Sequence, residues 1–160
     1  MAEMRQDKHY NPVLGVMAAY TYYRLGAIDD IRRTAYFYGQ NQQALPFDIA
    51  VLCNIGMSYE EGVFIAHIPD VRERVPINQT EADRPYTFRA TPAISVQVAG
   101  RFPWMRQGWG ICKENRNELV RKLSIFEHGL KQSLFTTLDN QTGQDLRDFL
   151  QLTKEEFTDE

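Results

Sequence analysis

Residues 101–109 read RFPWMRQGW, and the rest of the chain is organised around this segment. The segment contains both tryptophans of the protein, Trp104 and Trp109, together with two arginines, a proline and a glycine. A strand-like run precedes it, and a helix-like run follows Cys112. Because proline and glycine interrupt regular structure, we expect irregular backbone here, followed by a short strand over residues 109–112.

The length and composition are those of an ordinary globular domain. The chain has 160 residues, of which 43% are apolar and 24% are charged, enough for one domain with a core. Its net charge of −3 provides no overall field that favours nucleic acid or an anionic membrane. No run approaches the roughly 18 apolar residues of a membrane span, and the N-terminus lacks a signal-peptide core. We therefore expect a cytoplasmic protein with no membrane association.

The N-terminal part predicts a helical hairpin. Asn11 is a good N-cap and Pro12 suits the first helical position, so a helix should span residues 12–25. Acidic residues open a second helix over residues 29–39, and the short linker makes the two helices antiparallel neighbours. Two basic residues of the second helix are expected on its solvated face, namely Arg32 and Arg33.

The middle of the chain contains β-like runs. Residues 47–54, 63–68 and 86–98 are rich in residues typical of strands, with a turn before the second run. Pro92 interrupts the third run and indicates an edge, a bulge or two short strands. Residues 69–85 show no periodicity and predict a long loop, of the kind that is either functional or disordered.

The C-terminal part predicts two helices. The first extends from about residue 115 to 128, because apolar residues recur on one of its faces at Leu119, Leu123, Phe126 and Leu130. A β-like piece over residues 133–138 follows. The last helix is expected over residues 143–152, where Thr142 and Asp145 approximate a capping box.

These elements together predict an α+β fold, with an N-terminal helical hairpin, a small antiparallel sheet and two C-terminal helices. We expect a flexible lead-in over residues 1–10, a single domain over residues 11–152 and a loose acidic tail over residues 153–160.

The strongest local anomaly is the charge of residues 84–113, which include five cationic residues and no acidic one. Aromatic residues alternate with the cations, which suits single-stranded nucleic acid because aromatic rings stack on bases. The same residue types form hot spots in protein interfaces. A third interpretation places the tryptophans in the core with arginine stems over them. The candidate binding residues are Arg89, Arg101, Phe102, Trp104, Arg106 and Trp109.

The sequence contains no evident catalytic set. The three histidines are too far apart for a local metal motif, and no glycine-rich nucleotide motif is present, so we expect neither a metal nor a cofactor. Cys53 and Cys112 lack CxxC spacing and are expected to be reduced and buried. A pair formed in space by Cys112 or Cys53 with His67 remains an alternative, since cysteine catalysis needs a neighbouring base.

Two groups of segments resemble a known class of protein regions. The first group reads NPVLGVMAAY at residues 11–20, DDIRR at 29–33 and PFDIA at 46–50, and the second reads RQGW at 106–109 and SLFTTL at 133–138. They resemble accessory regions that accompany caspase-like protease domains in large bacterial proteins of the defence or signalling type. The catalytic histidine and cysteine motifs of caspases are absent from this sequence. The resemblance therefore implies a non-catalytic partner or regulatory module and assigns no catalytic residue.

We accordingly expect a non-enzymatic protein-interaction or regulatory module. It would bind a protein partner or a second copy of itself through residues 101–109, with the tyrosine-rich helical hairpin as a further surface. The alternatives are a small Cys/His-dependent enzyme and single-stranded nucleic-acid binding through residues 84–113.

Overall fold

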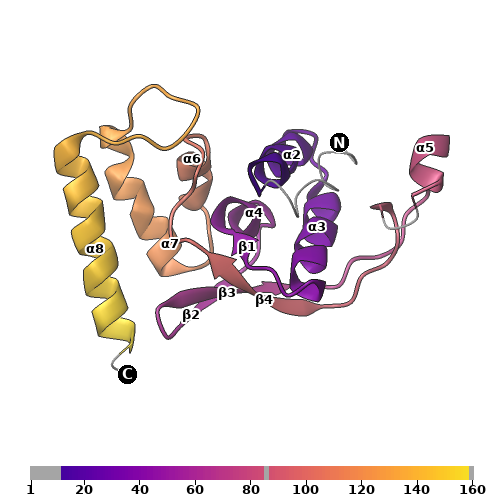
Figure 1. Ribbon diagram of the computed structural model, residues 1–160, viewed down its shortest axis with the longest axis horizontal. Helices are drawn as coiled ribbons and strands as arrows, with labels where there is room; N and C mark the ends of the chain where they lie inside the picture. Colours follow the sequence, from indigo (N-terminus) through magenta and orange to yellow (C-terminus); the bar gives the residue numbers. More distant parts are fainter. Residues whose placement is uncertain (1–11, 85–86, 159–160) are drawn as a thin grey trace.

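Two N-terminal helices form the expected pair in the computed structural model (Figure 1). Helix α2 spans Pro12–Arg24 and helix α3 spans Ile28–Gln40. The structure describes residues 12–84 and 87–158.

The ends of α2 agree with the signals in the sequence. Pro12 is its first residue. Gly26 follows the helix with a φ angle of +74°, a left-handed conformation that glycine adopts without strain. The predicted cap Asn11 and the lead-in over residues 1–10 lie outside the described residues.

The sheet has four strands in the order β1-β4-β3-β2. Strands β2, β3 and β4 are antiparallel neighbours as expected, but β1 runs parallel to β4, so the sheet is mixed. The strand expected over residues 63–68 is confirmed, whereas the one expected over residues 86–98 begins only after Pro92. The strands span Leu45–Pro46 (β1), Met57–Glu60 (β2), Val63–Ile68 (β3) and Ile94–Ala99 (β4).

The strand predicted over residues 47–54 is wrong, because Phe47–Leu52 forms helix α4. Every residue of α4 is buried, so its sequence shows no polar face that would reveal a helical period. The partner of β3 is instead β2, in the region expected to be a turn. The hairpin reverses at Glu61 and Gly62, whose positive φ angles of 53° and 83° match the twist of the two strands.

The short strand predicted over residues 109–112 is also wrong. Gly108–Cys112 forms helix α6, and one face of this helix is buried. The β-like piece predicted over residues 133–138 forms no strand within the described residues. It contributes two isolated bridges, Met105 to Phe135 and Leu130 to Leu138, and otherwise belongs to a loop.

The C-terminal helices follow the prediction in number but differ in extent. The first is divided into helix α7 (Glu118–Lys122) and a 3-10 helix, η3 (Leu123–Gly129). The last, α8, spans Asn140–Thr158, so it continues into the tail that was expected to be loose. Its first turn is capped by Asp139, whose Oδ1 accepts the backbone N–H of Thr142 at 2.8 Å.

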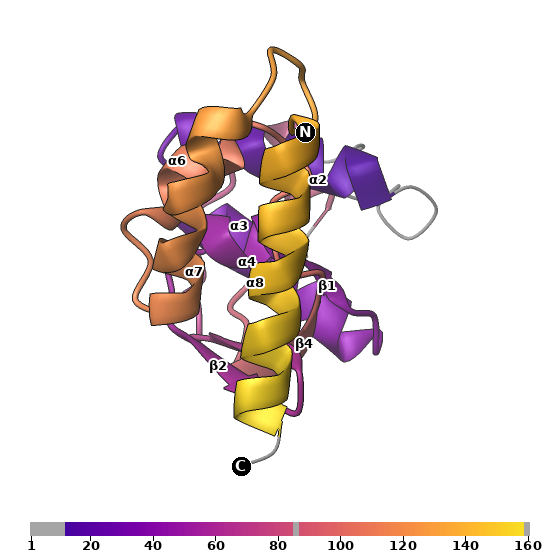
Figure 2. The same cartoon turned by 90° about the vertical axis from the view of Figure 1, so that its left-hand side faces the viewer.

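The core lies between the sheet and the helices above it. Alternate residues of β3 and β4 are buried on the face that α3 and α4 cover, while the opposite residues are exposed or partly exposed. Helix α3 approaches β4 at Gly39, where a Cβ atom would lie only 2.7 Å from a methyl group of Val96. Helix α8 stands at the end of the molecule opposite to α5 (Figure 1). It faces the viewer when the molecule is turned by 90° (Figure 2).

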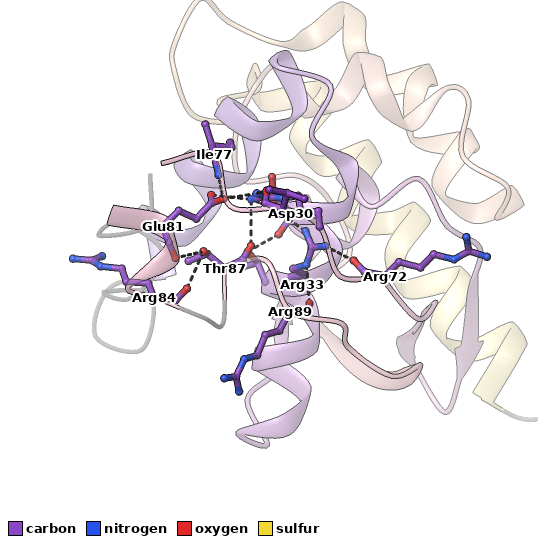
Figure 3. Close-up of polar contacts among 11 residues, drawn as sticks. Asp30, Arg33, Arg72, Ile77, Glu81, Arg84, Thr87 and Arg89 are labelled. Atoms are coloured by element: carbon purple, nitrogen blue, oxygen red, sulfur yellow. Dashed lines mark hydrogen bonds and ion pairs between the residues drawn. The ribbon is translucent and has the colours of Figure 1, made fainter. Parts of the chain in front are cut away.

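The long loop predicted after β3 forms an arm, described over residues 69–84 and 87–93, that carries the short helix α5 (Gln79–Ala82). Arg33 of α3 holds both limbs of this arm (Figure 3). Its Nε donates to the carbonyl of Arg89 at 3.0 Å, and its Nη2 donates to the carbonyl of Arg72 at 2.5 Å. The prediction that Arg33 is solvated is therefore wrong, since only 1% of the residue is exposed.

A second arginine ties the arm to the same helix. Asp30 accepts from Arg33 at 3.0 Å and from Nη2 of Arg74 at 3.1 Å. Arg74 also pairs with both carboxylate oxygens of Glu81, and this pairing raises the pKa of Arg74. The chain of ion pairs fixes α5 relative to α3, so the arm is part of the folded structure.

Candidate functional site

The segment Arg101–Trp109 is partly a core element. Trp109 has no exposed surface, and its indole N–H donates to the hydroxyl of Thr136 at 2.8 Å. That hydroxyl in turn donates to the carbonyl of Pro103 at 2.6 Å. Of the three interpretations of the segment, the core one therefore describes Trp109.

Asp48 of α4 determines the path of this segment. Its carboxylate accepts the backbone N–H groups of Trp104 at 2.7 Å and Met105 at 3.1 Å, and the hydroxyl of Tyr20 at 2.6 Å. Burial raises the pKa of Asp48, and the three hydrogen bonds oppose that rise. Asp48 was not among the residues predicted from the sequence, although a single acid in the apolar run FDIAVL is a recognisable signal.

The side chain of Arg101 is hydrogen-bonded to the C-terminal helix, α8. Its guanidinium donates to the carbonyl of Leu150 at 2.7 Å and to the hydroxyl of Thr153 at 2.6 Å. The same group lies 5.0 Å from the centre of the Tyr59 ring. Burial lowers the pKa of Arg101. Its described contacts indicate that Arg101 anchors α8 against the rest of the fold.

The remaining cations of residues 84–113 are not gathered on one surface. Arg89 lies on the arm, where its carbonyl binds Arg33 and its side chain points away from the ion-pair network (Figure 3). Arg84 is on the same arm. Lys113 pairs with Glu127 at 2.8 Å. The structure therefore separates Arg89 from the other candidate residues, which lie together around α6 and α8.

The outward-facing part of the segment continues into the loop between η3 and α8. The backbone N–H of Arg106 donates to Leu134 at 3.1 Å, and the N–H of Thr136 donates to Trp104 at 2.7 Å. Leu134 is 56% exposed and Phe135 is 44% exposed. We call the half-buried Trp104 and the exposed Arg106, Leu134 and Phe135 the loop patch.

A groove of about 450 Å³ lies beside the loop patch, between Phe102 and helix α8. Thr136 lines this groove and also belongs to the loop, so the two features are continuous. Two arginines, Arg101 and Arg147, lie among its lining residues. The apolar residues that line it are Phe102, Leu138, Leu146 and Leu150.

Neither thiol is placed for nucleophilic chemistry. Cys53 and Cys112 have no exposed surface, and burial raises the pKa of each thiol to about 12. Both ring nitrogens of His67 bind serine hydroxyls, those of Ser58 and Ser95. The described residues contain no group of three side chains that could hold a metal ion.

None of the helices in the described part of the chain combines the length and the apolar character needed to cross a bilayer. No protein-family model matches the chain, and no curated protein or solved structure is significantly similar to it.

Proposed function

We propose that this chain is a non-enzymatic protein-interaction module that binds through the loop patch and the adjoining groove. The observation that carries the proposal is the position of Leu134 and Phe135. These two large apolar side chains are exposed on a loop whose backbone is hydrogen-bonded to residues 104 and 106. A loop held in this way keeps apolar surface in water, which is typical of a binding surface.

The loop is preorganised for binding. Nε of Arg106 donates to the carbonyl of Lys131 at 3.1 Å across the loop, and Met105 and Phe135 form a bridge. Beneath it, Thr136 is hydrogen-bonded to the buried Trp109. Because the loop is already ordered, a partner would lose less affinity to the entropy of ordering it.

The chemistry of the surface indicates the kind of partner. The groove has an apolar lining that also includes the exposed Arg147, and the exposed Arg106 lies in the loop patch. The guanidinium of Arg101 is bound to α8. Tryptophan, phenylalanine and arginine are enriched among residues that dominate interface energies. The partner is a protein segment that presents an apolar side chain next to a carboxylate.

The proposal is tested by affinity capture from a lysate of the source organism with two matched variants. Leu134→Ser/Phe135→Ser removes the apolar part of the loop patch. Val75→Ser/Ile77→Ser removes two exposed apolar side chains from the distant arm. The wild type and the arm variant should retain the same protein, and the loop variant should lose it. Retention of that protein by all three would refute the assignment of the surface.

Two additional readouts address the other expectations. Sedimentation of the purified chain identifies a second copy as the partner if the wild type self-associates and the loop variant does not. Anisotropy with a labelled single-stranded oligonucleotide tests the nucleic-acid alternative, for which affinity should fall steeply with salt. The proposal includes a regulatory role in a bacterial defence or signalling system, and the sequence resemblance is the only support for that role.

A further inference from the structure

A second hollow lies where β2 begins and β3 ends, and it shares no lining residue with the groove beside α8. Its volume is about 480 Å³, within the range of small-molecule sites. Arg32, Arg116, His67 and Ser58 line it, and its lining includes no aspartate or glutamate. This is a locally basic hollow in a chain whose net charge is −3.

His67 is held at both ends by hydroxyl groups. Its Nε2 lies 2.9 Å from Oγ of Ser58, and its Nδ1 lies 3.0 Å from Oγ of Ser95. The three residues share the outer face of the sheet, because His67 pairs with Ser95 and Ser58 pairs with Ile65, two residues before the histidine. When Nε2–H donates to Ser58, the hydroxyl hydrogen of Ser58 is available to a ligand.

The two arginines have donor groups available to a ligand. Arg32 donates from Nε to the carbonyl of Cys53 at 3.0 Å and from Nη2 to the carbonyl of Asn54 at 3.4 Å, which fixes the guanidinium beside the hollow. The side chain of Arg116 is exposed. Among the side chains that the structure describes, those of residues 12–84 and 87–153, no carboxylate forms an ion pair with either arginine.

We propose that this hollow binds a phosphate group. Guanidinium groups match the oxygens of phosphate and carboxylate alike. Because both ring nitrogens of His67 are bound to serine hydroxyls, the donors left for a ligand are the two guanidinium groups and the hydroxyl of Ser58. Three separate donor groups suit a phosphate group, which accepts on at least three oxygens, better than a carboxylate, which has two. Ile55, Met57 and Pro69 also line the hollow and provide apolar contact for the rest of a phosphate monoester. The site is separate from the loop patch, so either proposal can fail without the other.

The test is a titration of the full chain followed by amide chemical shifts, with phenyl phosphate, inorganic phosphate and benzoate as probes. Phenyl phosphate should shift the amides of Gly56, Ser58 and His67 and reach saturation by about 10 mM. Benzoate, a carboxylate with the same ring, should bind with an affinity at least about tenfold lower than that of phenyl phosphate. Tighter binding of phenyl phosphate than of inorganic phosphate identifies a monoester as the ligand, and equal binding identifies free phosphate.

Arg116→Gln is the decisive variant, because Arg116 is exposed and its loss should leave the fold intact. The variant should bind phenyl phosphate with an affinity about tenfold lower than that of the wild type, which is the equivalent of one charge-assisted hydrogen bond. Arg72→Gln is the matched control, since it removes the same charge from a side chain that does not line the hollow and that points away from the ion-pair network (Figure 3). The proposal is overturned if Arg116→Gln leaves the affinity for phenyl phosphate unchanged, or if Arg72→Gln lowers it as much as Arg116→Gln does. It is also overturned if benzoate binds as tightly as phenyl phosphate, or if no amide shift reaches saturation.

Discussion

The carboxylate of Asp48 accepts the backbone N–H of Trp104 at 2.7 Å, joining two residues 56 positions apart. Because the same carboxylate also binds Met105 and Tyr20, one side chain connects α2, α4 and the segment that carries the loop patch. A buried acceptor of three hydrogen bonds is costly to remove, since its donors are then left without partners.

Replacement of Asp48 by alanine should destabilise the protein by about 3 kcal/mol or more, because three donors lose their acceptor in a buried place. Tyr20→Phe is the matched control. It removes one donor and leaves both backbone bonds, so it should cost about 1–2 kcal/mol. Urea unfolding at neutral pH measures both values. Equal losses in the two variants would contradict a role for Asp48 in holding the backbone of residues 104 and 105.

Replacement of Arg33 by methionine should cost about 3–5 kcal/mol, because it breaks a buried ion pair and leaves the carbonyls of Arg72 and Arg89 without their donor. Hydrogen exchange should show faster opening across the arm, at residues 69–84 and 87–93. Arg72→Ala removes a side chain that points away from the network, so its stability should stay within about 0.5 kcal/mol of the wild type (Figure 3). An arm that exchanges equally slowly in Arg33→Met would show that other contacts hold it.

The sequence predicted those elements whose periodicity is local. Strand β3 alternates between its two faces, and Leu119, Leu123 and Phe126 are buried on one side of their helices as their spacing indicated. Helix α4 was mistaken for a strand because a short apolar run has no polar residues at intervals that distinguish the two periods. The spacing of apolar residues therefore distinguished helix from strand reliably only where one face of the element is solvated.

The candidate site was less accessible to prediction, because exposure depends on contacts between distant segments. The composition of residues 101–109 does not reveal that Trp109 is buried by contacts that include Thr136 or that Arg101 is bound to Leu150. Leu134 and Phe135 were interpreted as part of a β-like piece, and only their place on the loop makes them candidates. Arg33 was misassigned for the same reason, since its partners lie on the arm, far along the chain.

Two glycines near α8 should respond to alanine in opposite directions. A Cβ atom at Gly129 would lie 2.2 Å from Oγ1 of Thr142 and 2.4 Å from its Cβ. Gly129→Ala should therefore cost about 1–3 kcal/mol by forcing η3 and α8 apart. Gly143 lies in α8 with no atom within 4 Å of its added Cβ, so Gly143→Ala should stabilise by about 0.5–1 kcal/mol. Thermal unfolding distinguishes them, and a stabilising Gly129→Ala would contradict the close contact with Thr142.

The two cysteines should be almost unreactive in the folded protein. A thiol pKa of about 12 leaves roughly one molecule in 10,000 as thiolate at pH 8, compared with about a quarter for an ordinary thiol. Burial further blocks access, so iodoacetamide should label Cys53 and Cys112 at least about a thousandfold faster in urea than under native conditions. Because the folded-state pKa is raised, ionisation of the thiols opposes folding, and stability should decline as the pH rises above about 8.5. Rapid native labelling of Cys112 would contradict its burial and return the Cys/His-dependent enzyme to consideration.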